Sequence, residues 1–397
     1  MISTIRQSYN AAFTEQRYAA FLADLNSAVY WPVDFRVAET PLFLDAATAQ
    51  RLARAAADVV GQLSTPAFRK HASTAVPKDL IVPAETPFPH FLCIDFALCQ
   101  NPAGHVVPQL IELQAFPTVA FFQALLTRTY PKHFGFPAGF TSYFGGLDEA
   151  GYIAALRRTI IADADPHETV LLEITPGQQK TRVDFAVTDQ ALGVRPVDLS
   201  SVRKRGKRLF YDRDGVETPI TRIYNRVIFD ELLRKKPAMA FSFFDDLDVQ
   251  WAGHPNWYFR VSKHTLPFLQ GPAIPPCHFV SELRSIPADL ENYVLKPLYS
   301  FAGLGVDITP TREKITALPN PSEWLLQRKV AYAPLLATPD GPAKAEVRLI
   351  LVGDGTSWPK LVNKLVRLSK GAMHGVDFNK GRTWVGASAG FHPVGSA

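Results

Sequence analysis

Two strand-like segments that carry acidic side chains constrain this chain more than any other feature. Residues 91–98 (FLCIDFAL) and 106–113 (VVPQLIEL) are mostly apolar, and the turn-like sequence CQNPAGH joins them. This pattern predicts a pair of neighbouring β-strands. An ionised carboxylate is costly to bury unless it is paired or binds a cation. The fold must therefore give partners to the carboxylates of these strands.

Asp95, Glu112 and Gln114 are the oxygen-bearing side chains of this strand pair. Alternation along a strand puts Glu112 and Gln114 on one face, flanked by the apolar Ile111 and Leu113. A magnesium ion that is held partly by nucleotide phosphates would satisfy such side chains. A buried salt bridge to one of the arginines would satisfy them as well, and the residues alone leave both interpretations open.

The segment YVLKPLYSFAGLGVDI, which begins at Tyr293, predicts a strand that enters a glycine loop. Its Lys-Pro pair places the ammonium of Lys296 at the C-terminal end of the strand, where α/β folds bind ligands. Gly303 and Gly305 follow, and glycines let backbone N–H groups close over phosphate oxygens. The GxxxxGK[ST] and GxGxxG signatures are absent. The segment therefore predicts a nucleotide site of another type, with a simple strand-ending loop as the alternative.

Two further segments are candidates to complete a nucleotide site. EWLLQRKVAYAP predicts a strand whose backbone, with Gln327 beside it, offers hydrogen bonds to an adenine edge. An ordinary buried strand is the alternative. SKHTLPFL predicts a short helix, in which Lys263 is either a second phosphate lysine or a solvated side chain.

Composition restricts the class of protein. With 397 residues, 47% hydrophobic and 20% charged, the chain predicts a globular protein of two or three subdomains. Its three cysteines form no CxxC pair, which favours a reducing compartment. The first residues contain no leader-like apolar region, and no apolar run reaches the roughly 18 residues of a membrane span. We therefore expect a cytoplasmic protein without a membrane partner.

The balance of charge favours small anionic ligands. The formal net charge is +5, and the sequence pI is near 9.0, which suits phosphates. The densest basic run, residues 203–208, has no interleaved aromatic residues. We interpret it as a solvated loop before a strand at 209–211, rather than as a nucleic-acid surface.

The remaining segments predict a mixed arrangement of helices and strands. Residues 46–63 keep apolar positions at helical spacing, and helix is also expected from Phe121 to Thr129. ETVLLEITP and VDFAVTD resemble strands, and a hairpin is expected about Asp214-Gly215. AEVRLILVG, KLVNKLVRLS and TWVGAS predict the last strands. These elements predict an α/β or α+β enzyme.

Taken in order, these motifs resemble the circularly permuted ATP-grasp ligases, in particular glutathionylspermidine synthase and the eukaryotic-type glutathione synthetase. In those families R-x-D-[FY] and E-x-N form a metal edge that precedes the nucleotide segment, and CIDF and IELQ match it here. Five later segments match in the family's order: YDRDG the RDG turn, SKHTL the lysine helix, LKPLYSFAGLG the glycine loop, WLLQRKVAYAP the adenine strand and LVRLSK the closing strand.

The resemblance implies a permuted ATP-grasp fold with ATP and Mg²⁺ as cofactors. The resemblance runs from about residue 90 to the C-terminus, and the apolar spacing of residues 46–63 predicts that the preceding segment (1–75) is largely helical. The other expected subdomains are a metal edge of the core (76–150), a central α/β substrate subdomain (151–250), a nucleotide-binding lid (251–335) and the rest of the core (336–397). It also implies residue roles: Lys263 and Lys296 on the α- and β-phosphates, the Ser300–Gly305 loop on the γ-phosphate, Gln327 on adenine, Asp95, Glu112 and Gln114 on magnesium, and Arg213 and Arg367 on substrate carboxylates.

The implied activity is a ligase that joins a small-molecule carboxylate to an amine through an acyl phosphate. Cys93 stands where the family has an arginine, Gln114 replaces an asparagine, and the glycine loop lacks its usual acidic residue. Loss of a donor that stabilises transition-state charge is often worth about 3 kcal/mol. A nucleotide-binding or partner-binding protein without turnover is therefore one alternative, and a kinase on the same scaffold is another.

Other patterns predict no separate chemistry. Residues 386–390 fit GxSxG, but only seven residues follow, with His392 and no acidic side chain, so a hydrolase triad in the usual order is excluded. Asp377-Phe378-Asn379 would suit the metal pair of an unpermuted ATP-grasp fold, although a turn is the simpler interpretation. The ten histidines form no HExxH motif.

Overall fold

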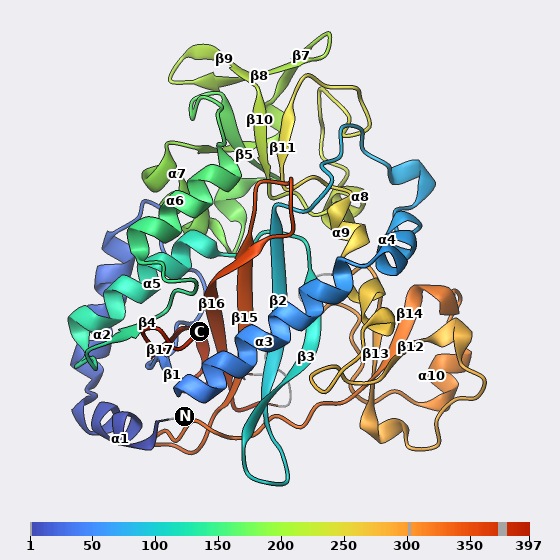
Figure 1. Ribbon diagram of the computed structural model, residues 1–397. Coiled ribbons are helices and arrows are strands. Elements are labelled where there is room, and N and C mark those ends of the chain that lie inside the picture. Colours follow the sequence, from blue (N-terminus) through green and yellow to red (C-terminus); the bar gives the residue numbers. More distant parts are fainter. Residues whose placement is uncertain (1, 301–302, 372–378) are drawn as a thin grey trace.

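The computed structural model describes residues 2–300, 303–371 and 379–397. Its centre is a seven-stranded sheet (Figure 1). In spatial order the strands are β1 (Leu42–Phe43), β17 (Gly386–Pro393), β16 (Lys360–Ser369), β15 (Lys344–Val352), β2 (Phe91–Gln100) and β3 (Val106–Gln114), and β4 (Phe140–Thr141) pairs with β17. The strand pair predicted at 91–113 is thus confirmed as the antiparallel hairpin β2–β3.

Helices cover both faces of this sheet. Helix α3 (Ala46–Leu63) begins at Asp45, whose side chain accepts a hydrogen bond from the N–H of Thr48. It crosses one face (Figure 1), and its buried side chains belong to the same core as Ile94 and Val347. The other face packs on α5 (Ala120–His133) and α6 (Glu149–Ile160). The remaining N-terminal helices are α1 (Ser3–Ala12), α2 (Glu15–Ser27) and α4 (Pro66–Ser73), so the predicted helical N-terminal region is confirmed.

A second sheet of parallel strands lies beyond one end of the main sheet (Figure 1). Its order is β11 (Gln250–Ala252), β10 (Arg222–Asn225), β5 (Thr169–Glu173) and β6 (Arg195–Asp198). The short helices α8 (Phe229–Lys235) and α9 (Trp257–Arg260) follow β10 and β11 along the chain.

The expectation that VDFAVTD forms a strand is wrong, because this segment lies in helix α7 (Arg182–Leu192). Every residue from Val183 to Thr188 is buried, so burial does not follow the alternation that the sequence suggests. The carboxylate of Asp184 accepts hydrogen bonds from the N–H groups of Phe121 and Phe122, at 2.8 and 2.9 Å. Asp184 therefore caps the neighbouring helix α5, a tertiary contact that the local pattern does not reveal.

A three-stranded antiparallel sheet projects from the parallel sheet. It contains β7 (Arg203–Arg205), β8 (Arg208–Arg213) and β9 (Val216–Ile220). The predicted hairpin at Asp214-Gly215 is confirmed, and both residues have positive φ (56° and 82°), as a type I′ turn requires.

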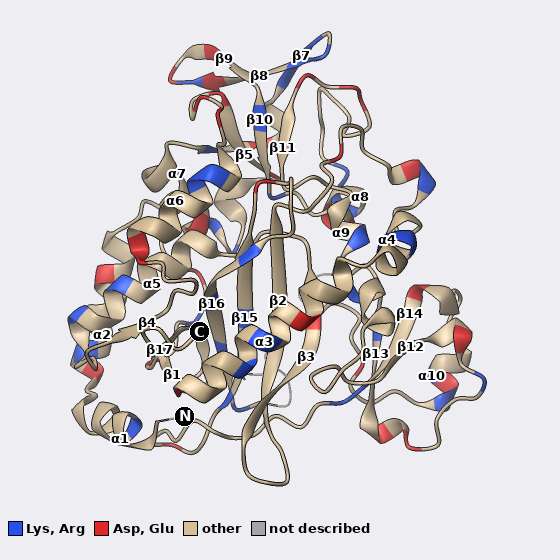
Figure 2. Cartoon of the chain, viewed as in Figure 1, with Lys and Arg blue, Asp and Glu red and all other residues tan. Residues whose placement is uncertain are grey.

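The basic run of residues 203–208 forms β7 and the turn to β8, rather than the predicted loop. Figure 2 shows acidic residues close to these cations. Lys204 pairs with Asp245 and Lys207 with Asp246, both at 2.5 Å. These ion pairs neutralise part of the positive charge of the run.

The third small sheet lies beside β3 (Figure 1). Its strands are β12 (Cys277–Phe279), β14 (Trp324–Arg328) and β13 (Tyr293–Pro297), and α10 (Arg312–Thr316) packs nearby. The strands expected at YVLKPLYS and EWLLQRKVAY are therefore confirmed. SKHTLPFL forms a 3₁₀-helix, Lys263–Phe268, which contacts β3 and β12.

These layers confirm a mixed α/β fold with several sheets. In the described parts of the chain, no helix has both the length and the apolarity needed to cross a membrane. Ser388, the central residue of the GxSxG pattern, is buried inside β17 and donates to the carbonyl of Thr40 at 2.6 Å. It does not lie on a strand-to-helix turn. Asp377 and Phe378 lie outside the described residues.

Candidate functional site

A polar patch interrupts the apolar face of the main sheet opposite α3. Asp95 of β2 lies in register with Glu112 of β3 on one side and with Arg348 of β15 on the other. On β15, Glu346 lies two residues before Arg348 and is opposite Arg367 of β16. Because residues in register share a face, four strands contribute charged side chains to one surface.

Asp95 is the centre of this patch and is only 1% exposed. The Nε and Nη2 atoms of Arg348 each donate to one of its carboxylate oxygens at 2.6 Å. Arg367 donates to Asp95 at 2.5 Å and also pairs with Glu346. Burial alone would lower the pKa of Arg348, but the adjacent Asp95 carboxylate raises it above its ordinary value. This is a fully charged, bidentate ion pair.

Glu112 lies between two cations. Its carboxylate is 3.7 Å from Nζ of Lys263 and 3.7 Å from Nη2 of Arg348. Burial by itself would raise the pKa of Glu112, but the charges of Lys263, Arg348 and Lys296 hold it below its ordinary value. Glu112 is therefore ionised and paired loosely, at distances longer than a hydrogen bond.

Lys296 is buried where β13 meets β3. Its Nζ donates to Oε1 of Gln327 at 2.6 Å and to the carbonyl of Ile111 at 2.9 Å. Gln327 in turn donates to the carbonyl of Leu110 at 3.2 Å. The β2–β3 register shifts here, so Ile111 is the extra residue of a bulge. Burial lowers the pKa of Lys296.

Lys263 holds the start of the glycine loop. Its Nζ donates to the carbonyl of Ser300 at 2.6 Å and lies 3.3 Å from the Ser300 hydroxyl. Gly303 and Gly305 have φ values of 77° and 74°, which only glycine adopts at little cost. Residues 301 and 302 of the predicted loop lie outside the described residues.

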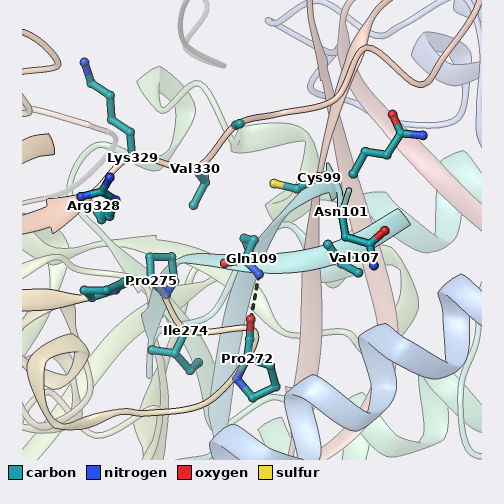
Figure 3. A pocket seen from close by; sticks show the side chains of 13 residues that line it. Cys99, Asn101, Val107, Gln109, Pro272, Ile274, Pro275, Arg328, Lys329 and Val330 are labelled. Carbon is teal, nitrogen blue, oxygen red and sulfur yellow. Dashed lines mark hydrogen bonds between the residues drawn. The ribbon is translucent and has the colours of Figure 1, made fainter. Parts of the chain in front are cut away.

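Two hollows lie along β3. A cavity of about 20 Å³, enough for one water molecule, is bordered by Glu112, Gln114, Lys263 and Ser300. A groove of about 460 Å³ lies between the far end of the β2–β3 hairpin and two passing segments, 272–276 and 328–331 (Figure 3). Along β3, Gln109 lines the groove and Glu112 borders the cavity. The two residues between them, Leu110 and Ile111, accept hydrogen bonds from Gln327 and Lys296.

Most of the predicted site residues come together. Arg367 contacts Asp95, and Lys263 contacts both Glu112 and Ser300. Lys296 and Gln327 contact each other and the backbone of residues 110 and 111, next to Glu112, and Gln114 borders the small cavity. Among the described residues, the buried Nε2 atom of Gln114 has no hydrogen-bond partner.

Arg213 does not join this group. It donates to the Tyr211 hydroxyl at 3.1 Å and to the carbonyl of Gly193 at 3.4 Å. Figure 1 shows β8 at the top of the molecule, away from β13 and β14, which lie beside β3.

Two other arginines lie at the site and were missed. Arg348 and Arg226 both contact Thr118: Arg226 donates to its carbonyl at 2.8 Å, and Nη1 of Arg348 lies 3.4 Å from its hydroxyl. The one available signal for Arg348 was a single arginine inside the apolar strand AEVRLILVG. For Arg226 it was the position directly after the strand RIYN.

The predicted magnesium ligands do not fit a metal ion in this arrangement. Both carboxylate oxygens of Asp95 accept hydrogen bonds from arginines, and Glu112 has a cation on either side. Magnesium needs near-octahedral oxygen ligands at close range. The described ranges contain no group of three His, Cys, Asp or Glu side chains able to hold a metal. Of the two interpretations that the sequence leaves open for Asp95, the structure shows the buried salt bridge, with Arg348 as its partner.

Glu173 ends β5 close to Arg226 and gives a pH-dependent prediction. It is 5% exposed, and burial raises its pKa to about 8. Because the pKa of Glu173 is higher in the folded protein than its ordinary value of 4.5, protonated Glu173 stabilises the fold fully below about pH 4.5. This contribution is lost as the pH rises through 8. Glu173→Gln should therefore gain stability over wild type between about pH 5.5 and pH 9 in urea unfolding. The control is Glu282→Gln, at an exposed position, whose free energy of unfolding should change with pH as that of wild type does. An equal gain in both variants would contradict the argument.

Comparison with known proteins supports the fold. No family model matches the chain, and no curated protein matches it. A solved structure of a glutathione synthetase-like effector from Globodera pallida, in its apo form, matches with a TM-score of 0.57 and 10% sequence identity over 96% of each chain. The chain therefore has a glutathione synthetase-like fold, as the sequence resemblance predicts. At this identity the similarity concerns the fold alone.

Proposed function

We propose that this protein is an ATP-dependent ligase of the circularly permuted ATP-grasp type, which joins a carboxylate to an amine through an acyl phosphate. One observation carries the proposal: Lys263 pairs with Glu112 and donates to Ser300 at the start of a glycine loop, while Lys296 donates to the carbonyl of Ile111, the residue next to Glu112. Lysines and glycine backbone N–H groups are the donors that phosphates require. In this proposal residues 251–335 form a lid over β3, and residues 151–250 select the substrates.

The nucleotide would lie between the lid and β3. The groove at residues 328–331 would offer room for a base, Gln327 directly precedes the lining residue Arg328, and the small cavity would mark the phosphate end. A cavity of about 20 Å³ admits no triphosphate, so the lid must move away from β3 before ATP binds. Lys263 and Lys296 would then exchange the carbonyls of Ser300 and Ile111 for phosphate oxygens.

The substrate carboxylate would lie near Arg367, whose side chain is 32% exposed. A guanidinium matches a carboxylate with two parallel hydrogen bonds, which orients it toward the phosphates. Closure of the glycine loop would exclude water from the acyl phosphate. We assign no step to a metal ion, because the predicted ligands are paired with arginines.

A second candidate is a nucleotide-binding or partner-binding protein without turnover. Cys93 is buried, and its Sγ lies 3.5 Å from the carbonyl of Phe116. Burial raises the pKa of this thiol to about 12, so it supplies no charge in place of an arginine. The similar solved structure is described as an effector, which also suits this candidate.

The test is ADP release by the purified protein, with ATP and a panel of carboxylates and amines, followed by mass analysis of the product. A ligase should release ADP only when both substrates are present, and the product should contain an amide. ATP binding without ADP release supports the second candidate, and a phosphorylated hydroxyl compound would indicate a kinase. If calorimetry detects no ATP binding, the proposed function is wrong.

A further inference from the structure

The charge around the candidate phosphate site is unusual because cations outnumber carboxylates. Apart from Arg226, which pairs with Asp184, four cations of the described residues lie around three acidic side chains: Lys263, Lys296, Arg348 and Arg367 against Asp95, Glu112 and Glu346. The patch therefore has an excess of one positive charge before any ligand binds.

Arg348 lies where a divalent cation would have to lie to use these carboxylates. Its guanidinium donates to both oxygens of Asp95 at 2.6 Å and is 3.7 Å from Glu112. It is therefore placed between the two carboxylates that the sequence assigns to magnesium. Two positive charges about 4 Å apart repel each other even near a protein surface, so the guanidinium and a metal ion cannot share this position at low cost.

Unlike the two arginines, the two lysines of the site make no short hydrogen bond to a carboxylate among the described residues. Lys263 is 3.7 Å from Glu112, and its short hydrogen bond goes to the neutral carbonyl of Ser300. Within the described ranges, Lys296 likewise donates to two neutral oxygens, of Gln327 and Ile111. A phosphate would give both ammonium groups an anionic acceptor, which forms a stronger hydrogen bond.

We propose that this site binds a nucleoside triphosphate without a divalent cation, because Arg348 already neutralises the carboxylates that would otherwise hold the cation. The inference rests on the proposed function, since it concerns the same nucleotide site. Its ligand is the uncomplexed triphosphate, whereas the metal-bound form lacks part of the negative charge that the lysines would pair with.

The experiment compares ATP binding by calorimetry in excess EDTA and in excess Mg²⁺, on the full chain. We expect binding in EDTA to be at least as tight as in Mg²⁺, because magnesium removes free ATP. If magnesium tightens ATP binding by more than about threefold (about 0.65 kcal/mol), this inference is wrong but the proposed function still stands. Absence of binding in both buffers rejects the proposed function and this inference together.

The double variant Asp95→Asn/Arg348→Gln tests the role of Arg348 directly. It removes the ion pair without leaving a stranded charge and takes away one of the two cations beside Glu112, so Glu112 can accept a metal and magnesium should now tighten ATP binding by about tenfold. The matched control is Asp214→Asn/Arg195→Gln, an exposed bidentate pair outside the site, which should behave as wild type. A folded double variant that stays indifferent to magnesium contradicts the assignment. If its thermal melt shows that it is unfolded, the wild-type comparison alone decides.

Discussion

Replacing Lys296 by methionine should weaken ATP binding by about 10- to 100-fold, since hydrogen bonds to charged groups are worth roughly 1.5–3 kcal/mol. Lys296 is 6% exposed, belongs to the side of the lid that contacts β3, and donates to the carbonyl of Ile111, the residue next to Glu112. Methionine keeps much of the length of the side chain but removes the ammonium group. Calorimetry with ATP gives the dissociation constant, and ADP release in the presence of substrates should fall with it.

The control is Lys314→Met in helix α10 of the same lid. Lys314 is 52% exposed and pairs with Asp307, away from β3, so this variant should bind ATP as wild type does. A thermal melt of both variants separates loss of binding from loss of fold, because Lys296→Met also leaves Gln327 and Ile111 without their donor. Unchanged ATP binding by a folded Lys296→Met variant would show that nucleotide binds elsewhere or not at all.

One part of the candidate site consists of residues whose strands can be recognised from local sequence patterns. Lys296 lies inside β13 next to its last residue, Gln327 lies inside β14, and Glu112 lies in the β2–β3 hairpin. Local periodicity identifies such strands, and the positions of polar residues within them indicate which side chains face a ligand. Convergence of these residues then needs only that β13 and β14 pair and lie against β3, which they do.

The part that could not be predicted depends on pairing between distant strands. Arg348 and Asp95 are 253 positions apart, and their contact follows from the register of β15 on β2. Sequence patterns do not fix which strands are neighbours, so the partner of Asp95 could not be named. The same limit explains α7, where Asp184 is buried because it caps α5 and not because it alternates along a strand.

Replacing Arg348 by methionine should destabilise the protein by about 3–5 kcal/mol, the usual cost of leaving one partner of a buried ion pair uncompensated. Asp95 is 1% exposed and would keep only Arg367, which it already shares with Glu346. Urea unfolding gives the free energy directly. The loss should be much larger than that of Arg195→Met, which breaks an exposed pair with Asp214 and should cost at most about 1 kcal/mol.

The double variant Asp95→Asn/Arg348→Met decides what the ion pair contributes. If the cost of Arg348→Met comes from a stranded Asp95 carboxylate, removing that charge should recover most of the lost stability, because buried ion pairs are often replaceable by neutral groups. The pair would then be retained for the charge that it gives to the site and not for stability. A double variant as unstable as Arg348→Met would mean instead that Arg348 stabilises the sheet through its other neighbours, Thr118 and Glu112.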